Sequence, residues 1–304
     1  MIIDCHTHIG DLRRAHALDK VPVTLESLIA RLDEEGIDKA VVLPLWPNPE
    51  GIHLPYLFSE RRDIVSQVLA TMDYGERLIP FANLDPRMGG NSAGAEFGWA
   101  LERFVAMGCV GIGEVTANLP ADDPRVVNLF RQCGEWQLPV LIHSTGPGEG
   151  YYGLIDPVGL PNLERLLQQV PDTTIIGHGP GFWAEIDGEI TDGNKSGYPE
   201  GPIGGEGALQ RLMRTYPNLY ADISAHSGHN ALTRDPRRGV AFLKEFGDRI
   251  LFGTDVCFAG PDDRMPHLGL LRGLLASGEI DEALFQQVAG SNLLRILPRL
   301  ASVA

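Results

Sequence analysis

The sequence predicts a single domain over residues 1–304 with the fold of a (β/α)8 TIM barrel. Eight short apolar runs alternate with amphipathic stretches of helical period, as expected for strands that are each followed by a helix. A barrel of this type needs about 250 residues. The remaining length fits a long loop after the sixth strand and helices at the C-terminus. No Gly-x-Gly-x-x-Gly turn follows the first strand, which disfavours the alternative of a doubly wound open sheet.

The predicted elements follow one another with clear boundary signals. The strands are expected at residues 1–8, 39–45, 78–84, 109–115, 139–143, 173–178, 219–224 and 249–255. The helices are expected at about 25–35, 59–72, 93–107, 124–137, 160–170, 208–215, 237–246 and within 267–300. Thr24 precedes the first helical pattern as an N-cap, and Gly36 follows it as a C-terminal stop. Pro47 and Pro49 end the second strand, since proline cannot donate to a strand ladder.

Residues 179–207 form the longest interval without a periodic pattern. The interval is rich in glycine, proline and acidic residues, which indicates a loop. Loops of this length in compact domains are often functional. We therefore expect it to close over a bound substrate, with Phe182 and Trp183 covering the site.

Composition excludes several classes of partner. The chain is 43% hydrophobic, and 25 Lys+Arg against 40 Asp+Glu give a formal net charge of -15. This charge repels phosphate backbones and anionic lipids, so neither a nucleic acid nor a membrane is an expected partner. The first residues read as a strand rather than a signal peptide, which favours a cytoplasmic protein. The four cysteines are scattered and are interpreted as reduced thiols.

Polar residues with metal-ligand chemistry stand at the carboxyl ends of the predicted strands. His6 and His8 end the first strand and point the same way, because side chains alternate along an extended chain. The other such residues are Glu114, His143, His178 and Asp255, at the ends of strands four, five, six and eight. In a barrel these ends converge at one rim, where catalysis takes place. The histidines outside the rim, His16, His53 and His267, are expected to be solvated.

This arrangement resembles the amidohydrolase superfamily. The resemblance is carried by Asp4-Cys5-His6-Thr7-His8, Leu141-Ile142-His143, Ile176-Gly177-His178-Gly179 and Leu251-Phe252-Gly253-Thr254-Asp255. It is strongest to the amidohydrolase family 2 branch, which includes aminocarboxymuconate semialdehyde decarboxylase, resorcylate decarboxylases and pyrone dicarboxylate lactonases. The resemblance implies that His6, His8, His143 and Asp255 are metal ligands, and that His178 is a ligand or an acid–base group.

Two further assignments are expected of other polar residues. Many binuclear members of the superfamily have a carboxylated lysine on strand four, where this chain has Glu114. Glu114 is therefore either a bridging ligand or a buried carboxylate paired with Arg87 or another base. The candidate substrate-binding residues are Arg13, Trp46, Trp183 and His226, although His226 fits a hydrogen-bonded loop histidine slightly better.

The expected activity follows from the ligand set. A divalent ion, Zn²⁺ or else Mn²⁺ or Fe²⁺, bound as one or two ions, would activate water, and Asp255 would accept its proton. Hydrolysis of an amide, lactone or ester of a small molecule is the first interpretation. The alternative is metal-dependent decarboxylation or hydration of a small aromatic or unsaturated acid. A non-catalytic metal-binding barrel is a third interpretation, which the polar rim with Asp255 disfavours. A homo-oligomer, a dimer, is the expected assembly.

Overall fold

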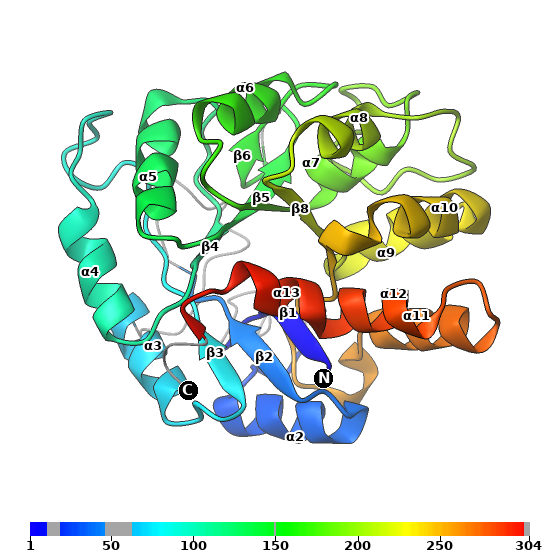
Figure 1. The fold of residues 1–304 in the computed structure, drawn as a ribbon, viewed down its shortest axis with the longest axis horizontal. Coiled ribbons are helices and arrows are strands. Elements are labelled where there is room, and N and C mark those ends of the chain that lie inside the picture. The colour runs from blue at the N-terminus through cyan, green and yellow to red at the C-terminus, as the bar shows by residue number, and fades with distance from the viewer. Residues whose placement is uncertain (11–18, 46–62, 149, 301–304) are drawn as a thin grey trace.

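The protein forms a barrel of parallel strands surrounded by helices (Figure 1). Its structure, a computed structural model, describes residues 1–10, 19–45, 63–148 and 150–300. The strands are β1 Ile3–Thr7, β2 Lys39–Val42, β3 Leu78–Pro80, β4 Ile112–Val115, β5 Val140–Thr145, β6 Leu154–Ile155, β7 Ile175–His178, β8 Leu219–Asp222 and β9 Ile250–Leu251. All strand pairs given for them are parallel.

Backbone contacts join the strands into a ring. One sheet has the order β1-β2-β3, and the other has the order β4-β5-β7-β8-β9. A parallel bridge between Ala82 and Ile112 joins β3 to β4. A second bridge, between Thr7 and Val256, joins β1 to the segment after β9, and the Cys5 amide donates to the Phe252 carbonyl at 2.9 Å. The predicted barrel is thus confirmed, with β6 as an addition that pairs with the end of β5.

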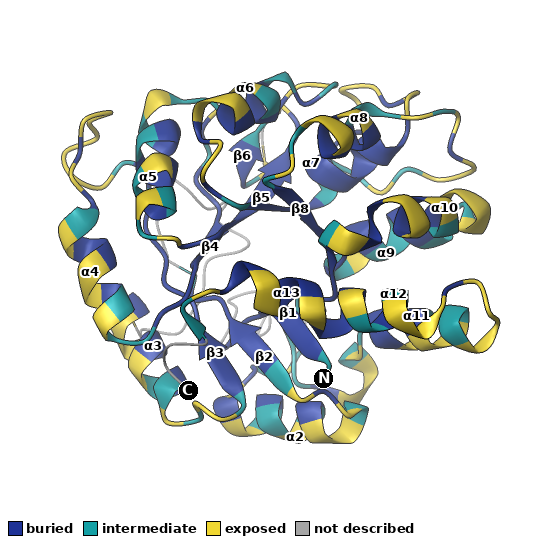
Figure 2. Cartoon of the chain, in the orientation of Figure 1, coloured by how far each residue is buried: buried dark blue, intermediate teal, exposed yellow. Residues whose placement is uncertain are grey.

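Two hydrophobic cores lie on the two sides of this ring. The outer core packs the strands against the surrounding helices and accounts for most of the buried residues in Figure 2. The inner core fills the barrel with residues from the ring strands, among them Ile3, Leu141, Ile176 and Leu251. Leu293, Ile296 and Leu297, from α13 Asn292–Ile296 and the residue after it, belong to the same inner core. The barrel is therefore packed through its centre.

The predicted helices are present with differences at their ends. The helices are α2 Leu25–Glu35, α3 Ile64–Met72, α4 Gly98–Ala106, α5 Pro124–Glu135, α6 Pro161–Gln169, α7 Pro180–Trp183, α8 Ala208–Thr215, α9 Ala225–Thr233, α10 Pro236–Phe246, α11 His267–Ala276, α12 Glu282–Gln286 and α13. Of these, α7 and α9 are further helices that the sequence did not predict. Both predicted caps of α2 are confirmed: the Thr24 hydroxyl accepts from the Ser27 amide at 3.1 Å, and Gly36 has φ 68°. The predicted start of the second helix, at Ser59, lies outside the described residues.

Three expectations about local structure are wrong. The interval 179–207 is not all loop, because it begins with α7 and the 3-10 turn Ala184–Ile186. Phe182 and Trp183 are almost fully buried within it, at 0% and 1% exposed, so they do not cover the site from outside. His267 is not solvated either: it is fully buried at the start of α11, and its Nε2 donates to the Ala225 carbonyl at 2.8 Å. Among the described helices, none is long and apolar enough to cross a bilayer.

Candidate metal centre and substrate cavity

The barrel interior changes from apolar to polar toward the carboxyl ends of its strands. Side chains two residues apart on a strand point to the same face. Three polar residues stand two positions after inner-core residues of the same strand: His143 after Leu141, His178 after Ile176 and Asp222 after Tyr220. All three polar side chains are buried. The same alternation that packs the barrel thus directs these three side chains into the barrel interior at the carboxyl ends of the strands.

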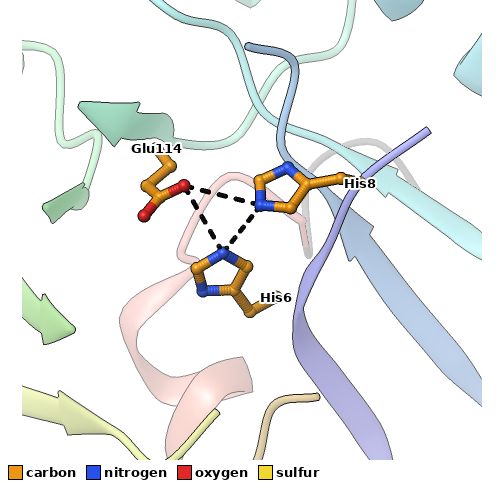
Figure 3. Close-up of side chains that lie close together, drawn as sticks. All are labelled: His6, His8 and Glu114. Atoms are coloured by element: carbon orange, nitrogen blue, oxygen red, sulfur yellow. Dashed lines mark hydrogen bonds and ion pairs between the residues drawn. The ribbon is translucent and has the colours of Figure 1, made fainter. Parts of the chain in front are cut away.

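His6 and His8 form the centre of the polar cluster (Figure 3). Nδ1 of His6 lies 2.7 Å from Oδ2 of Asp222, and Nδ1 of His8 lies 2.8 Å from the Leu43 carbonyl. Since both partners are acceptors, each Nδ1 carries a proton, and each Nε2 is left to face the centre. The two Nε2 atoms are 3.0 Å apart. Two facing lone pairs at this distance require a cation between them, which is either a proton or a metal ion.

Glu114 connects this pair to the remaining histidines. Its Oε2 lies 3.7 Å from Nε2 of His6 and 3.5 Å from Nε2 of His8. Its Oε1 lies 2.6 Å from Nδ1 of His143 and 3.7 Å from Nε2 of His178. Glu114 is therefore a buried carboxylate paired with a base, but that base is His143. Of the expected partners, Arg87 or another base, the structure places another base beside Glu114, and Arg87 forms an ion pair with Asp85 at 2.7 Å.

Asp255 completes the cluster from the segment after β9. Its Oδ1 lies 3.6 Å from Nε2 of His6 and 3.3 Å from Nε2 of His8. Its side chain is 19% exposed, whereas those of His6, His8 and Glu114 are 0%, 5% and 4% exposed. Asp255 is thus the cluster carboxylate most open to an arriving molecule.

The distances within the cluster fit a divalent ion. Tetrahedral bonds of about 2.1 Å, typical of Zn²⁺ with nitrogen and oxygen ligands, place neighbouring ligand atoms about 3.4 Å apart. The facing atoms of His6, His8, Glu114 and Asp255 lie 3.0 to 3.7 Å apart in the five measured pairs. Ligand atoms also converge in the groups His6–His178–Asp255 and Glu114–His143–His178. The residues present therefore fit a metal centre, and His143 approaches it on the Oε1 side of Glu114.

The electrostatics of the cluster favour a bound cation. Burial raises the pKa of Glu114, but the charge of His143 and hydrogen bonds from the histidines outweigh burial and hold that pKa well below its ordinary value. Burial likewise opposes the charged form of Asp255, yet His6 and His8 lower its pKa. Burial lowers the pKa of His8, but hydrogen bonds to Asp255 and Glu114 raise it to about 9. The carboxylates are thus ionised and are stabilised by nearby positive charge, which a divalent ion would supply in place of protons.

His178 is held by a hydroxyl on the neighbouring strand. The Ser224 hydroxyl donates to Oδ2 of Asp222 at 2.7 Å, and Nδ1 of His178 lies 2.9 Å from the same hydroxyl. The hydroxyl therefore accepts from Nδ1 of His178, and Nε2 of His178 faces the cluster. Asp222 thus orients His6 directly, and it orients His178 both through Ser224 and directly, since its Oδ2 lies 3.2 Å from Nδ1 of His178.

A cavity of about 230 Å³ opens onto the cluster. His143, His178 and Asp255 line its floor. Tyr151, Tyr152 and Tyr198 line its wall, together with Thr145, Ser196 and Ser227. The Tyr152 ring stacks on His143, with centroids 4.1 Å apart and planes at 29°. The cavity therefore offers a place for a small molecule beside the candidate metal centre.

The predicted substrate-binding residues are only partly placed by the structure. Arg13 and Trp46, like His16 and His53, lie outside the described residues. Trp183 does not line the cavity, so its expected contact with substrate is wrong: its indole N–H donates to the Asp222 carbonyl at 2.7 Å in the core. His226 starts α9 beside the lining residues Ala225 and Ser227, and its ring contacts Tyr198 edge-on at 6.3 Å.

The sequence interpretation missed the tyrosines of the cavity wall. Tyr151 and Tyr152 lie between β5 and β6, a strand that was not predicted, and Tyr198 lies within the 179–207 interval. The signal available for the first two was the Tyr-Tyr pair a few residues after His143. Tyr198 carried no such signal, because its place in the cavity depends on how the interval folds back.

The fold agrees with the comparisons to known proteins. The family model described as Amidohydrolase matches residues 3–299. Among curated proteins, none matches this sequence. A probable 2-pyrone-4,6-dicarboxylic acid hydrolase from Acinetobacter baumannii, solved with citric acid bound, has 15% identity and a TM-score of 0.58, covering 97% of this chain and 98% of that chain.

Two further solved structures have the same fold. A dihydroxybenzoic acid decarboxylase from Polaromonas sp. JS666, with bound manganese and the inhibitor 2-nitroresorcinol, has 16% identity and a TM-score of 0.60, covering 97% of this chain and 96% of that chain. An amidohydrolase from Burkholderia multivorans with bound HEPES has 13% identity and a TM-score of 0.63, covering 98% and 99%. The chain belongs to the amidohydrolase family, and it is an enzyme of that family whose clustered histidines and carboxylates fit a divalent metal ion.

Proposed function

We propose that this enzyme hydrolyses an amide, lactone or ester bond of a small molecule with the help of a divalent ion held by His6, His8, Glu114 and Asp255. The observation that carries the proposal is the position of Asp255. It lies 3.3 Å from Nε2 of His8 in the cluster and also lines the cavity. A carboxylate in this place could hold a divalent ion and also contact a substrate in the cavity.

The roles of the side chains follow from their contacts. A bound divalent ion supplies a Lewis acid and a water of lowered pKa. Asp255, ionised because the histidines lower its pKa, accepts a proton on the cavity side and returns it to the leaving group. His178, whose Nε2 faces the cluster, donates a hydrogen bond or proton to the substrate oxygen when it is protonated. His143 and Glu114 hold each other in position at 2.6 Å.

Metal-dependent decarboxylation is the second candidate activity. The observation that favours it is the aromatic wall of the cavity, in which Tyr152 lies nearly parallel to His143. A flat aromatic or unsaturated acid could stack there, with its carboxylate toward the cluster. The Polaromonas structure, named a dihydroxybenzoic acid decarboxylase, binds manganese in the same fold.

We further propose Zn²⁺ as the ion, with Mn²⁺ or Fe²⁺ as alternatives, because histidine and carboxylate ligands suit all three. The two oxygens of Glu114 face different histidines, which supports a second ion on the His143–His178 side. We also propose a cytoplasmic location and a small-molecule substrate, and the surplus of 15 negative charges supports the expectation of neither nucleic-acid nor membrane partners. A homodimer is the assembly that we propose.

The test is a reaction in isotopically labelled water. Protein reconstituted with Zn²⁺ or Mn²⁺ is screened against lactones, N-acyl compounds and hydroxybenzoates. Hydrolysis places labelled oxygen in a product carboxylate, and we expect this result. Release of carbon dioxide without label in a product carboxylate would assign the decarboxylase activity instead. Protein with His6→Ala and His8→Ala is the control, and it should lose both bound metal and turnover.

A further inference from the structure

The interval between β7 and α8 is fastened to the barrel in a way that its composition does not suggest. Its first turn, α7, is buried, as its dark colour in Figure 2 shows. The excursion that follows is closed at its base, where Asp187 and Glu206 form an antiparallel bridge. Arg234 of the neighbouring α9–α10 connection donates to Oδ2 of Asp187 at 2.9 Å. Residues 187–206, called here the excursion, therefore begin and end at one fixed point.

A buried ion pair joins this excursion to the turn Ala184–Ile186 that precedes it. Lys195 is fully buried, and its Nζ donates to Oε1 of Glu185, a residue that is itself 2% exposed. The same oxygen accepts from the Gly159 amide at 2.9 Å. A buried ion pair seldom stabilises a fold more than apolar residues of the same size would, because both charges lose their hydration. Its strict geometry, by contrast, restricts where the two backbones can lie.

The next residue reaches the substrate cavity. The Ser196 hydroxyl accepts from the Gly146 amide at 2.8 Å and lies 3.2 Å from Oγ1 of Thr145. Gly146 leaves room for this contact, since a Cβ there would lie 2.7 Å from Oγ of Ser196. Ser196 and Tyr198 line the cavity together with His143. The side chains of Lys195 and Ser196 thus lie on opposite sides of the excursion: Lys195 points into the core and Ser196 lines the cavity.

We propose that the buried Lys195–Glu185 pair is a positioning device that fixes Ser196 and Tyr198 on the wall of the substrate cavity. The proposal rests on the proposed function, because it assigns this cavity to the substrate. Without the pair, the excursion keeps its base at Asp187 but loses the constraint next to Ser196. The cavity wall then samples several positions, and substrate binding weakens while the groups around the metal centre stay in place.

The first test does not depend on activity. Hydrogen exchange is followed in the metal-loaded protein with Lys195→Met, which removes the ammonium and keeps the length of the side chain. We expect exchange of the Gly146 amide and of residues 195–200 to rise about tenfold or more, because their protection reports local opening. Lys244→Met is the matched control, because Lys244 lies in an exposed pair with Glu279, at 3.9 Å. Leu271→Ala, a buried change in α11, controls for general loss of stability.

The double variant Lys195→Met with Glu185→Met keeps the test valid if the single variant does not fold. It removes both charges, so that no uncompensated carboxylate remains in the core. We expect it to melt near the wild-type temperature and still to exchange quickly at Gly146. Wild-type protection in the double variant would overturn the proposal, because packing alone would then position the excursion. Equally fast exchange in Leu271→Ala would overturn it as well.

The second test uses the substrate found by the screen above. We expect Lys195→Met to raise KM about tenfold, with kcat within about threefold and metal content unchanged, as for a loss of uniform binding. In the double variant Lys195→Met with Ser196→Ala, KM should rise above the wild-type value by a smaller factor than the product of the factors measured for the two single variants. An unchanged KM in a variant with fast exchange would refute the link to substrate binding. If the screen finds no substrate, the proposed function fails. The hydrogen-exchange result still tests, independently of activity, whether the Lys195–Glu185 pair positions the excursion.

Discussion

Replacing Asp222 with asparagine tests how the fold controls the metal centre. Asp222 is fully buried. Its Oδ2 lies 2.7 Å from Nδ1 of His6 and accepts from the Ser224 hydroxyl at 2.7 Å, while Oδ1 accepts from the Ser224 amide at 2.9 Å. In Asp222→Asn the amide oxygen stays at the Oδ1 place, because the Ser224 backbone amide is a fixed donor, and the NH₂ group takes the Oδ2 place. A donor then faces Nδ1–H of His6.

The conflict has a defined consequence at the metal centre. His6 relieves it by moving its proton from Nδ1 to Nε2, the atom that lies 3.0 Å from Nε2 of His8. Nε2 then lacks the lone pair that a metal ion needs. Loss of such an orienting partner weakens metal binding about 10- to 100-fold, or about 1.4–2.8 kcal/mol. The lost charge-assisted hydrogen bonds should also reduce the free energy of unfolding by about 1.5–3 kcal/mol.

The assay is a competition titration of metal-free protein with Zn²⁺ and a chromophoric chelator. Asp156→Asn is a suitable control, because Asp156 is also a buried carboxylate but binds the amides of Asn162 and Leu163 at the start of α6. The control should bind Zn²⁺ as the wild type does. A dissociation constant of Asp222→Asn within about twofold of the wild type would refute the argument that Asp222 sets the tautomer of His6.

Three further predictions concern single carboxylates. Asp255→Asn should stay folded and keep part of its metal, but lose about 10²-fold or more in kcat as expected for a missing general base; near-normal kcat in folded protein would contradict that role. Glu114→Gln should lower the metal content from near two ions to near one if the carboxylate bridges, and metal analysis of the purified variant decides this. Asp156 has a pKa raised by burial from 3.8 to about 6, so its folded carboxyl binds a proton more tightly than the unfolded one does. Its contribution to stability is therefore largest below about pH 4 and falls by about 3 kcal/mol as the pH rises through 6. The difference in unfolding free energy between wild type and Asp156→Asn should change by this amount between about pH 4 and pH 7 in urea titrations, and a constant difference would rule out the shift.

The sequence by itself determined the barrel and the location of its polar end. The alternation of apolar runs and helical patterns is local information, because each strand or helix has its own pattern of apolar residues. Eight strands could therefore be recognised without knowledge of which strands they pair with. The placement of His6 and His8 on one side needed only the two-residue repeat of a strand, whereas the 3.0 Å between their Nε2 atoms depends on the partners of their Nδ1 atoms, Asp222 and the Leu43 carbonyl. The caps of α2 were equally local, since Thr24 and Gly36 act within one turn.

Tertiary structure alone decided which groups meet. His143 rather than Arg87 pairs with Glu114, because adjacent strands bring the first two together within the barrel. Burial of His267 depends on the way α11 packs beside Ala225, which lies 42 residues away in sequence. Trp183 likewise turned into the core rather than toward the substrate. The spacing of residues along the sequence does not identify such partners, because contacts between distant segments form only when the whole chain folds.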